Sequence, residues 1–391
     1  MRTAEKHSST MSPRFATIRG QLGRKRTALN FAAETMWYVP GAFGIAHLLG
    51  PRYSLRCVLF HDVADTESSF TRGLGGTITR KNFEAALKFI TQNYTPVSLQ
   101  EVLSSFDGQR LPPRPVLVTF DDAYKSVCEF AAPLCSKFGV PAIFFVNGNC
   151  LDNKQLGMDN LVCHVANVFG LNTINASIRT LEGYGNLEVR SLAEVFERFL
   201  PAISLAVRNA FRDALLRMAH ITGDELAAEA NLYLTSRQLR ELVGFNFEIG
   251  DHTYTHVNCR SLLVDDFVHE VDENRAALEA ISGRKVRSFS VPYGSSADLT
   301  PDLVAHLYCS GYEAIFLAEG RANSPHAGRL QLNRISLKTG SEAGLFSEIE
   351  VLPRLRAIRD GLFDAPIKRI SVGREQTDQS MVTVPAGQDG D

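Results

Sequence analysis

The stretch VLVTFDDAYKS, residues 116–126, ends an apolar run with two adjacent carboxylates. Each negative charge of such a crowded pair raises the proton affinity of the other, so placing Asp121 beside Asp122 costs free energy. A simple turn is one explanation of the pair. The other is a cation that sits between the two carboxylates and a reactive group. The second explanation requires further ligands elsewhere in the chain.

Strand and helix patterns alternate on both sides of this stretch. Residues 56–62 form a predicted buried strand, and residues 79–93 follow with the apolar spacing of a helix. Repeated strand–helix units build a parallel sheet with helices outside it, either open or closed into a barrel. Residues 150–234 interrupt the alternation with a run rich in helix-forming residues, which predicts a helical insertion.

The predicted strands end in polar residues. In parallel α/β folds, catalytic residues gather at the carboxyl ends of the strands. The polar endings here are FHD, TFDD, GDHTYTH and VPYG, at residues 60–62, 119–122, 250–256 and 291–294. These four segments are therefore expected to meet at one end of the sheet.

Two of these residues, His252 and His256, are four positions apart. On a helical turn, or on a loop curled like one, both imidazoles face the same way. Two unrelated surface histidines are the alternative explanation. A catalytic zinc site takes three protein ligands and leaves a position for water, so the two histidines need a third ligand. The Asp121–Asp122 pair is the candidate, with one carboxylate on the metal and the other free as a base.

The blocks TFDD, HTYTH and VPYG, in this order, resemble those of the polysaccharide deacetylases, carbohydrate esterase family 4 with its NodB-homology domain. The resemblance runs from about Cys57 to about Leu345, apart from the helical insertion. It implies an α/β fold, a distorted (β/α) barrel of the NodB-homology type.

The resemblance also implies a role for each matching residue. Asp121 is expected to be the catalytic base. The ligands implied for a divalent metal, Zn²⁺ with Co²⁺ or Ni²⁺ as alternatives, are Asp122, His252 and His256. The wall of the substrate groove is expected at Pro292, Tyr293 and Gly294.

Two features of the family are absent from this chain. Ser290 stands where the RxPYG block has the Arg that orients the catalytic Asp. We predict that Arg334, on a later strand, supplies the guanidinium from another direction. The late LxHD block, which carries the catalytic acid, is also missing. His61, at the tip of the first strand, is the predicted acid, with His326 as a less favoured alternative. A structural hydrogen-bonding role is the other explanation of a strand-end histidine.

These features predict a metal-dependent hydrolase that removes an acyl group, N-acetyl by the resemblance, from a sugar in polysaccharide or glycoconjugate biosynthesis. An N-acetylated saccharide or a lipid-linked sugar is the expected substrate. The departures from the family favour one alternative, a metal-binding but catalytically altered protein with a non-hydrolytic role in polysaccharide assembly. A sugar-nucleotide transferase would use the carboxylate pair to hold a cation on a diphosphate. It would leave the two histidines unexplained.

The composition is typical of a globular protein. Of 391 residues, 45% are hydrophobic and 21% are charged. The net charge of −2 gives no electrostatic reason to expect a nucleic-acid partner. Seven scattered cysteines without CxxC pairs indicate reduced thiols, so we expect a cytoplasmic location.

The two ends of the chain differ from the middle. Residues 1–54 are predicted to be a basic arm and a docking segment, because the first 30 residues carry seven Lys or Arg and one Glu. The apolar stretch that follows has no uncharged run long enough for a spanning helix. Contact of this segment, through Trp37 and Tyr38, with an anionic membrane face is the alternative. The deacetylase-like domain is predicted over 55–345, and a C-terminal helix and disordered tail over 346–391.

Overall fold

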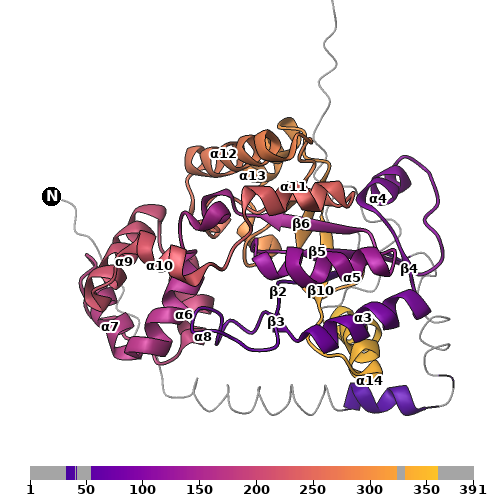
Figure 1. The fold of residues 1–391 in the computed structure, drawn as a ribbon, viewed down its shortest axis with the longest axis horizontal. Helices are drawn as coiled ribbons and strands as arrows, with labels where there is room; N and C mark the ends of the chain where they lie inside the picture. Colours follow the sequence, from indigo (N-terminus) through magenta and orange to yellow (C-terminus); the bar gives the residue numbers. More distant parts are fainter. Residues whose placement is uncertain (1–31, 40, 42–53, 324–330, 360–391) are drawn as a thin grey trace, which may run out of the picture.

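The computed structural model describes residues 32–39, 41, 54–323 and 331–359, and a barrel of parallel strands lies at its centre (Figure 1). Within these residues, seven strands pair side by side and return to the first, in the order β1-β10-β9-β8-β7-β6-β5-β1. Their bounds are Arg56–Phe60 (β1), Pro115–Phe120 (β5), Ala142–Val146 (β6), Glu248–Asp251 (β7), Ser288–Ser290 (β8), Ala314–Leu317 (β9) and Leu332–Ser336 (β10). The distorted (β/α) barrel predicted from the sequence is confirmed.

Two shorter pairings accompany this barrel. Strand β4 (Thr95–Pro96) pairs with the beginning of β5. Strands β2 (Asp62–Val63) and β3 (Thr77–Ile78) form a separate two-stranded sheet beyond the end of β1. The loop between β2 and β3 therefore begins next to the carboxyl end of the barrel.

Most residues of the strands are apolar because both faces of the sheet are covered. Successive residues of β6 alternate between two clusters of buried side chains, with Ile143 and Phe145 in one and Phe144 in the other. The cluster of Ile143 and Phe145 also contains Leu117 and Phe316 from other strands, so these side chains share one face of the sheet. The larger cluster joins the opposite face to the surrounding helices.

Helices surround the barrel. Figure 1 shows α12 and α13 along one side of it and α3 and α14 along another. The bounds of these helices and their neighbours are Arg80–Asn93 (α3), Leu99–Phe106 (α4), Ala132–Lys137 (α5), Ser236–Gly244 (α11), Val264–Ser282 (α12), Pro301–Cys309 (α13) and Glu342–Phe346 (α14). Helix α4 begins with a capping box, in which the Ser98 hydroxyl accepts from the Glu101 N–H and the Glu101 carboxylate accepts from the Ser98 N–H.

A group of helices lies on one side of the barrel (Figure 1). In the sequence, these helices come after β6 and before β7. The longer ones are Met158–Phe169 (α6), Leu171–Arg179 (α7), Leu205–Ala219 (α9) and Gly223–Ala230 (α10), with Leu192–Glu194 (α8) between α7 and α9. The loop between β2 and β3 contacts α6, where Asn167 Nδ2 donates to the carbonyls of Ser69 and Arg72 at 3.0 and 2.9 Å. Helices are thus present where the composition predicted them.

No single helix of the described part has both the length and the apolar character to cross a membrane. The pair α6 and α7, bent by 120°, meets these criteria together by length and composition only.

The described part of the N-terminal segment packs against the domain. The Trp37 ring lies 5.9 Å from that of Phe89 on α3 and 5.5 Å from that of Phe346 on α14. After α14 the chain continues as helix through η8 (Ser347–Val351) and α15 (Leu352–Arg359). The predicted basic arm and disordered tail lie mostly outside the described residues, so both stay predictions, as does the membrane contact.

Candidate active site

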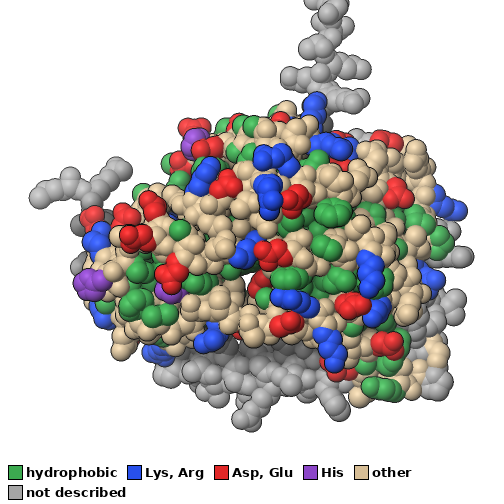
Figure 2. Space-filling model, viewed as in Figure 1, with side chains coloured by type: hydrophobic (Ala, Val, Ile, Leu, Met, Phe, Trp, Pro, Cys, Tyr) green, Lys and Arg blue, Asp and Glu red, His purple; other side chains and the backbone are tan. Residues whose placement is uncertain are grey.

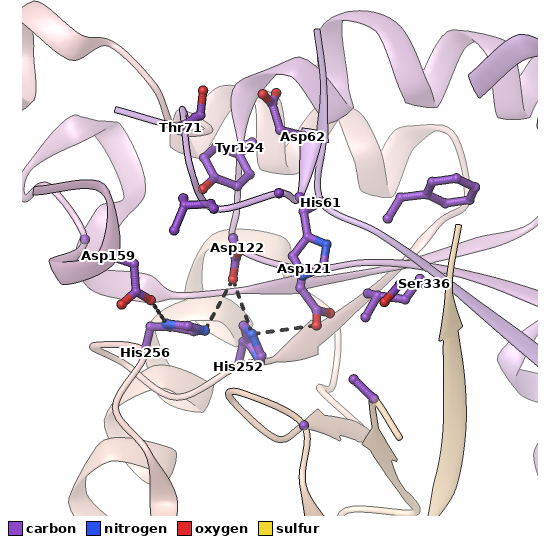
Figure 3. Close-up of a pocket in the computed structure, with 18 of the residues that line it drawn as sticks. His61, Asp62, Thr71, Asp121, Asp122, Tyr124, Asp159, His252, His256 and Ser336 are labelled. Carbon is purple, nitrogen blue, oxygen red and sulfur yellow. Dashed lines mark ion pairs between the residues drawn. The ribbon is translucent and has the colours of Figure 1, made fainter. Parts of the chain in front are cut away.

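The polar strand ends meet at the carboxyl end of the barrel, around a cavity of about 370 Å³ (Figure 3). In the view of Figure 2 the surface is hollowed between the barrel and the helices that follow β6. The predicted site residues that line the cavity are His61, Asp121, Asp122, His252, His256, Tyr293, Gly294 and Arg334. Pro292 is buried and is not among the lining residues, while His326 lies outside the described part of the chain.

A left-handed turn brings both carboxylates to this cavity. Strand β5 ends at Phe120, and Asp122 and Ala123 follow with φ angles of 73° and 56°. Successive strand residues point to opposite sides, so the turn allows Asp121 and Asp122 to face the same space. The Ala123 carbonyl accepts from the Leu234 N–H at 2.8 Å, which holds the turn in a conformation that costs about 1–2 kcal/mol per residue.

Asp122, His252 and His256 form a triad whose ligand atoms all lie within 4.8 Å of one another. Asp122 Oδ1 is 3.4 Å from the Nε2 atom of each histidine. Two ligand bonds of about 2.0–2.1 Å that meet at a tetrahedral angle separate their donor atoms by about 3.4 Å. The donor set and its spacing therefore fit a divalent metal such as Zn²⁺.

Charge also favours this assignment. Burial alone would raise the pKa of Asp122, but His256 and His252 lower it more, so the net pKa lies well below the usual range. A carboxylate must be ionised to bind a metal. Asp122 meets that condition at neutral pH.

The second ring nitrogen of each histidine has a partner. His252 Nδ1 lies 2.8 Å from the carbonyl oxygen of Ser290, and His256 Nδ1 lies 2.8 Å from Asp159 Oδ2. Because a carbonyl and a carboxylate oxygen only accept, both Nδ1 atoms carry the proton. In the neutral form of each histidine, the Nε2 lone pair would then lie on the side of Asp122, as metal ligation requires.

The two histidines lie on a loop that is not helical. Thr253 and His256 have φ angles of 61° and 53°. Asn147 Nδ2 donates to the carbonyls of His252 and Thr253 at 2.5 and 3.0 Å, and Arg208 Nη2 donates to that of His256 at 3.0 Å. The four-residue spacing therefore brings the two imidazoles to the same side on a curled loop. The sequence allowed either such a loop or a helical turn.

Asp121 is held by a guanidinium. Arg334 Nη1 and Nη2 donate to its two carboxylate oxygens at 2.7 and 2.8 Å, and Nη2 also contacts Ser290 Oγ at 2.7 Å. Burial alone would raise the pKa of Asp121, but Arg334 and then His252 lower it more, and the net pKa is below the usual value. The structure thus places Arg334, on β10, against Asp121, and the small Ser290 at the end of β8 is hydrogen-bonded to both.

His61 lies beside the carboxylate pair (Figure 3). Burial lowers the pKa of its imidazole, and this effect exceeds the opposite influence of Asp122 and Asp121. His61 is therefore neutral at neutral pH. Its predicted part as a catalytic acid requires a proton that arrives during the reaction.

The VPYG block forms a tight turn beside the triad. Tyr293 and Gly294 have φ angles of 64° and 76°. A Cβ atom at Gly294 would lie 2.4 Å from Ala318 Cβ, so glycine is required both by the conformation and by the space. The Tyr293 ring centroid is 5.2 Å from that of His256, and its hydroxyl donates to Asp159 Oδ1 at 3.2 Å.

Comparison with known proteins agrees with this site. The sequence model of one family, Polysaccharide deacetylase, matches residues 214–311, which include both histidines of the triad and the VPYG block. The predicted resemblance to the polysaccharide deacetylases is confirmed. No curated protein matches the chain.

Among solved structures, one deacetylase has a similar fold. The Streptococcus pyogenes deacetylase PplD in complex with acetate has 15% identity and a TM-score of 0.50, over 77% of this chain and 100% of that one. IcaB from Ammonifex degensii has 19% identity and a TM-score of 0.48, over 76% of this chain and 97% of that one. At these identities the likeness to PplD shows a common barrel, and the family match supports a deacetylase function.

Three residues around the deacetylase blocks were not predicted from the sequence. They are Asn147 after β6, Asp159 on α6 and Arg208 on α9, which contact the histidine loop. An Asp in the first turn of a helix is common because it complements the helix dipole, so Asp159 carries no distinctive signal. Its position next to His256 depends on how the insertion packs.

Proposed function

We propose that this chain is a metal-dependent deacetylase that hydrolyses an N-acetyl amide bond on a sugar. The observation that carries the proposal is the triad of Asp122, His252 and His256 within 4.8 Å, beside a second carboxylate paired with a guanidinium. The match to the Polysaccharide deacetylase family supports acetyl as the acyl group and hydrolysis as the class of reaction.

Zn²⁺ is the proposed metal, and Co²⁺ or Ni²⁺ suit the same ligands. When bound by Asp122, His252 and His256, such an ion polarises an acyl carbonyl and lowers the pKa of a water molecule.

The protein's own residues would handle the protons. Asp121 is the proposed base that takes a proton from the attacking water, and its Oδ2 is 3.7 Å from His252 Nε2, next to the metal position. Arg334 keeps Asp121 ionised and fixes the plane of its carboxylate. The proton that Asp121 takes from the water would pass to the neutral His61, which would deliver it to the leaving amine as the C–N bond breaks, while the acyl group leaves as a carboxylate.

The substrate class is also proposed. The cavity walls include the apolar side chains Leu74, Met158, Phe196 and Tyr233, from the β2–β3 loop and the helical insertion. These surfaces suit the face of a sugar ring. We propose an N-acetylated saccharide or a lipid-linked sugar, handled in the cytoplasm, with the N-terminal segment as the contact to a membrane face.

The first experiment measures tightly bound metal per chain in the purified protein and in the variants Asp122→Ala and His252→Ala. We expect close to one metal ion per unaltered chain and loss in both variants. Acetate release from N-acetylated saccharides is then measured, with Asp121→Asn as the variant that keeps the metal and loses turnover.

Two results would count against the proposal in different ways. If no metal binds even after zinc is added, the ligand assignment is wrong. If metal binds and no acetylated saccharide or lipid-linked sugar is hydrolysed, the non-hydrolytic alternative is favoured. His61 is tested separately, because His61→Ala should lose turnover and keep its metal.

A further inference from the structure

The ligand His256 is oriented by a side chain from outside the deacetylase blocks. His256 Nδ1 donates to Asp159 Oδ2 at 2.8 Å, and the two side chains are only 17% and 14% exposed. The other ligand, His252, donates to the backbone carbonyl of Ser290, which is present whatever the side chain. Asp159 is therefore the orienting group that a substitution can remove.

Asp159 is fixed in place from both sides of its carboxylate. Its Oδ1 accepts from the Tyr293 hydroxyl at 3.2 Å, so the carboxylate joins the histidine loop to the VPYG turn. The next residue, Asn160, donates from Nδ2 to the Tyr124 hydroxyl at 3.0 Å and accepts from the Tyr233 hydroxyl at 2.5 Å. These bonds tie the first turn of α6 to the segment directly after Asp122.

The insertion supports the backbone of the same loop. Arg208, on α9, is 3% exposed, and its Nη2 donates to the carbonyls of Thr255 and His256 at 3.3 and 3.0 Å. A buried guanidinium holds a carbonyl strongly because its hydrogen bonds are charge-assisted. Both the ring and the main chain of His256 are thus held by helices that follow β6.

We propose that Asp159 is a positioning residue that sets the metal affinity of the site by fixing the orientation of His256. Its carboxylate holds the proton on Nδ1 and directs Nε2 to Asp122 Oδ1, 3.4 Å away. This inference rests on the ligand triad of the proposed function. Loss of a carboxylate behind a ligating histidine typically weakens metal binding by about 10–100-fold. The helical insertion is then part of the metal site, in addition to forming a cavity wall.

The test compares the zinc dissociation constants of Asp159→Ala, Asp159→Asn and the unaltered full chain, by competition with a chromogenic chelator. Asp224→Asn is the matched control, because Asp224 is an exposed Asp in the first turn of another helix of the insertion. We expect about 10–100-fold weaker binding in Asp159→Ala. The loss should be smaller in Asp159→Asn, whose carbonyl can still accept from Nδ1, and Asp224→Asn should bind as the unaltered chain does.

A double variant separates positioning from general damage to the fold. In a His256→Ala background, Asp159→Ala should weaken zinc binding little further, because its partner is already gone. The visible spectrum of bound Co²⁺ should also change in Asp159→Ala and stay unchanged in Asp224→Asn.

Equal zinc affinity of Asp159→Ala and the unaltered chain would overturn this inference alone. An equal loss with and without His256 would also overturn it, since Asp159 would then act by another route. Absence of zinc binding by the unaltered chain would overturn the proposed ligand triad as well. The two failures are therefore distinguishable.

Discussion

The adjacent carboxylates at Asp121 and Asp122 have different partners. Asp121 is paired on both oxygens with Arg334, and Asp122 faces the two imidazoles of the triad. Separate environments offset the repulsion between the charges and give each carboxylate its own task. The Arg334 guanidinium beside Asp121 and the proposed metal beside Asp122 would together explain why the two carboxylates can be adjacent.

Removal of Arg334 should therefore abolish turnover without loss of metal. The Arg334→Ala variant would leave the buried Asp121 charge without its counter-ion, which costs about 3–5 kcal/mol of stability. Metal per chain, acetate release and the free energy of unfolding in urea measure the three effects. Full activity of this variant would discard the predicted role of Arg334.

A double variant checks whether the uncompensated charge of Asp121 causes the loss of stability. In Arg334→Ala with Asp121→Asn, the uncompensated charge is gone, so part of the lost stability should return. Arg237→Ala, on the exposed face of α11, is the control and should change stability by less than about 0.5 kcal/mol. A double variant as unstable as the sum of the two single variants would contradict the argument.

At the scale of helices and strands, local patterns were informative. The buried strands are mostly apolar runs, and the spacing of Ser98 and Glu101 is that of the capping box they form. The contacts of Asn147 and Arg208 could not be predicted, because they depend on which loop the insertion packs against. Local sequence specifies the elements and the triad, whereas the residues that orient the triad are specified by tertiary packing.

One helix, α12, connects two strand ends through a single side chain. Asn274 is 0% exposed and donates to the Val146 carbonyl and to Asp251 Oδ1, at 2.9 and 2.8 Å, while its Oδ1 accepts from the Gly148 N–H at 2.7 Å. Asn274→Ala would take one buried hydrogen bond from each of these three groups, of which Asp251 Oδ1 keeps a second bond, from the Thr253 N–H. Each such group costs about 1–3 kcal/mol, so chemical denaturation should show a loss of at least about 2 kcal/mol.

Glu273→Ala on the same helix is the matched control for Asn274→Ala. Glu273 is exposed and pairs with His269 at the surface, so its removal should cost less than about 0.5 kcal/mol. Similar losses in the two variants would mean that helix propensity, and not the buried hydrogen bonds, governs the result.

At the scale of the whole molecule, Glu348 contributes stability that should be lost as the pH rises from about 4.5 to about 7. Burial raises the pKa of Glu348 to about 7 from an ordinary value of 4.5. Over this range Glu348 keeps its proton in the folded state and releases it in the unfolded state. Its contribution to the free energy of unfolding therefore decreases as the pH rises. Glu348→Gln should remove up to about 3 kcal/mol of this fall.

Urea unfolding at several pH values measures the slope of the unfolding free energy against pH. Glu342→Gln, at an exposed position, is the control. Part of the slope should remain in Glu348→Gln, because burial also raises the pKa of Asp251 to about 7. An unchanged slope in Glu348→Gln would show that this carboxyl does not bind the proton.

The closure of the barrel has a consequence for the order in which the protein forms. Strand β1 pairs with both β5 and β10, and Asp121 meets Arg334 only across 213 residues of chain. During synthesis, the last neighbours of the first strand and of Asp121 therefore emerge only after almost the whole domain has been made. Contacts so distant along the chain make folding slow. A nascent chain that lacks β10 has an open sheet edge and a charge without its partner, and it is in this interval that the protein most needs protection from aggregation.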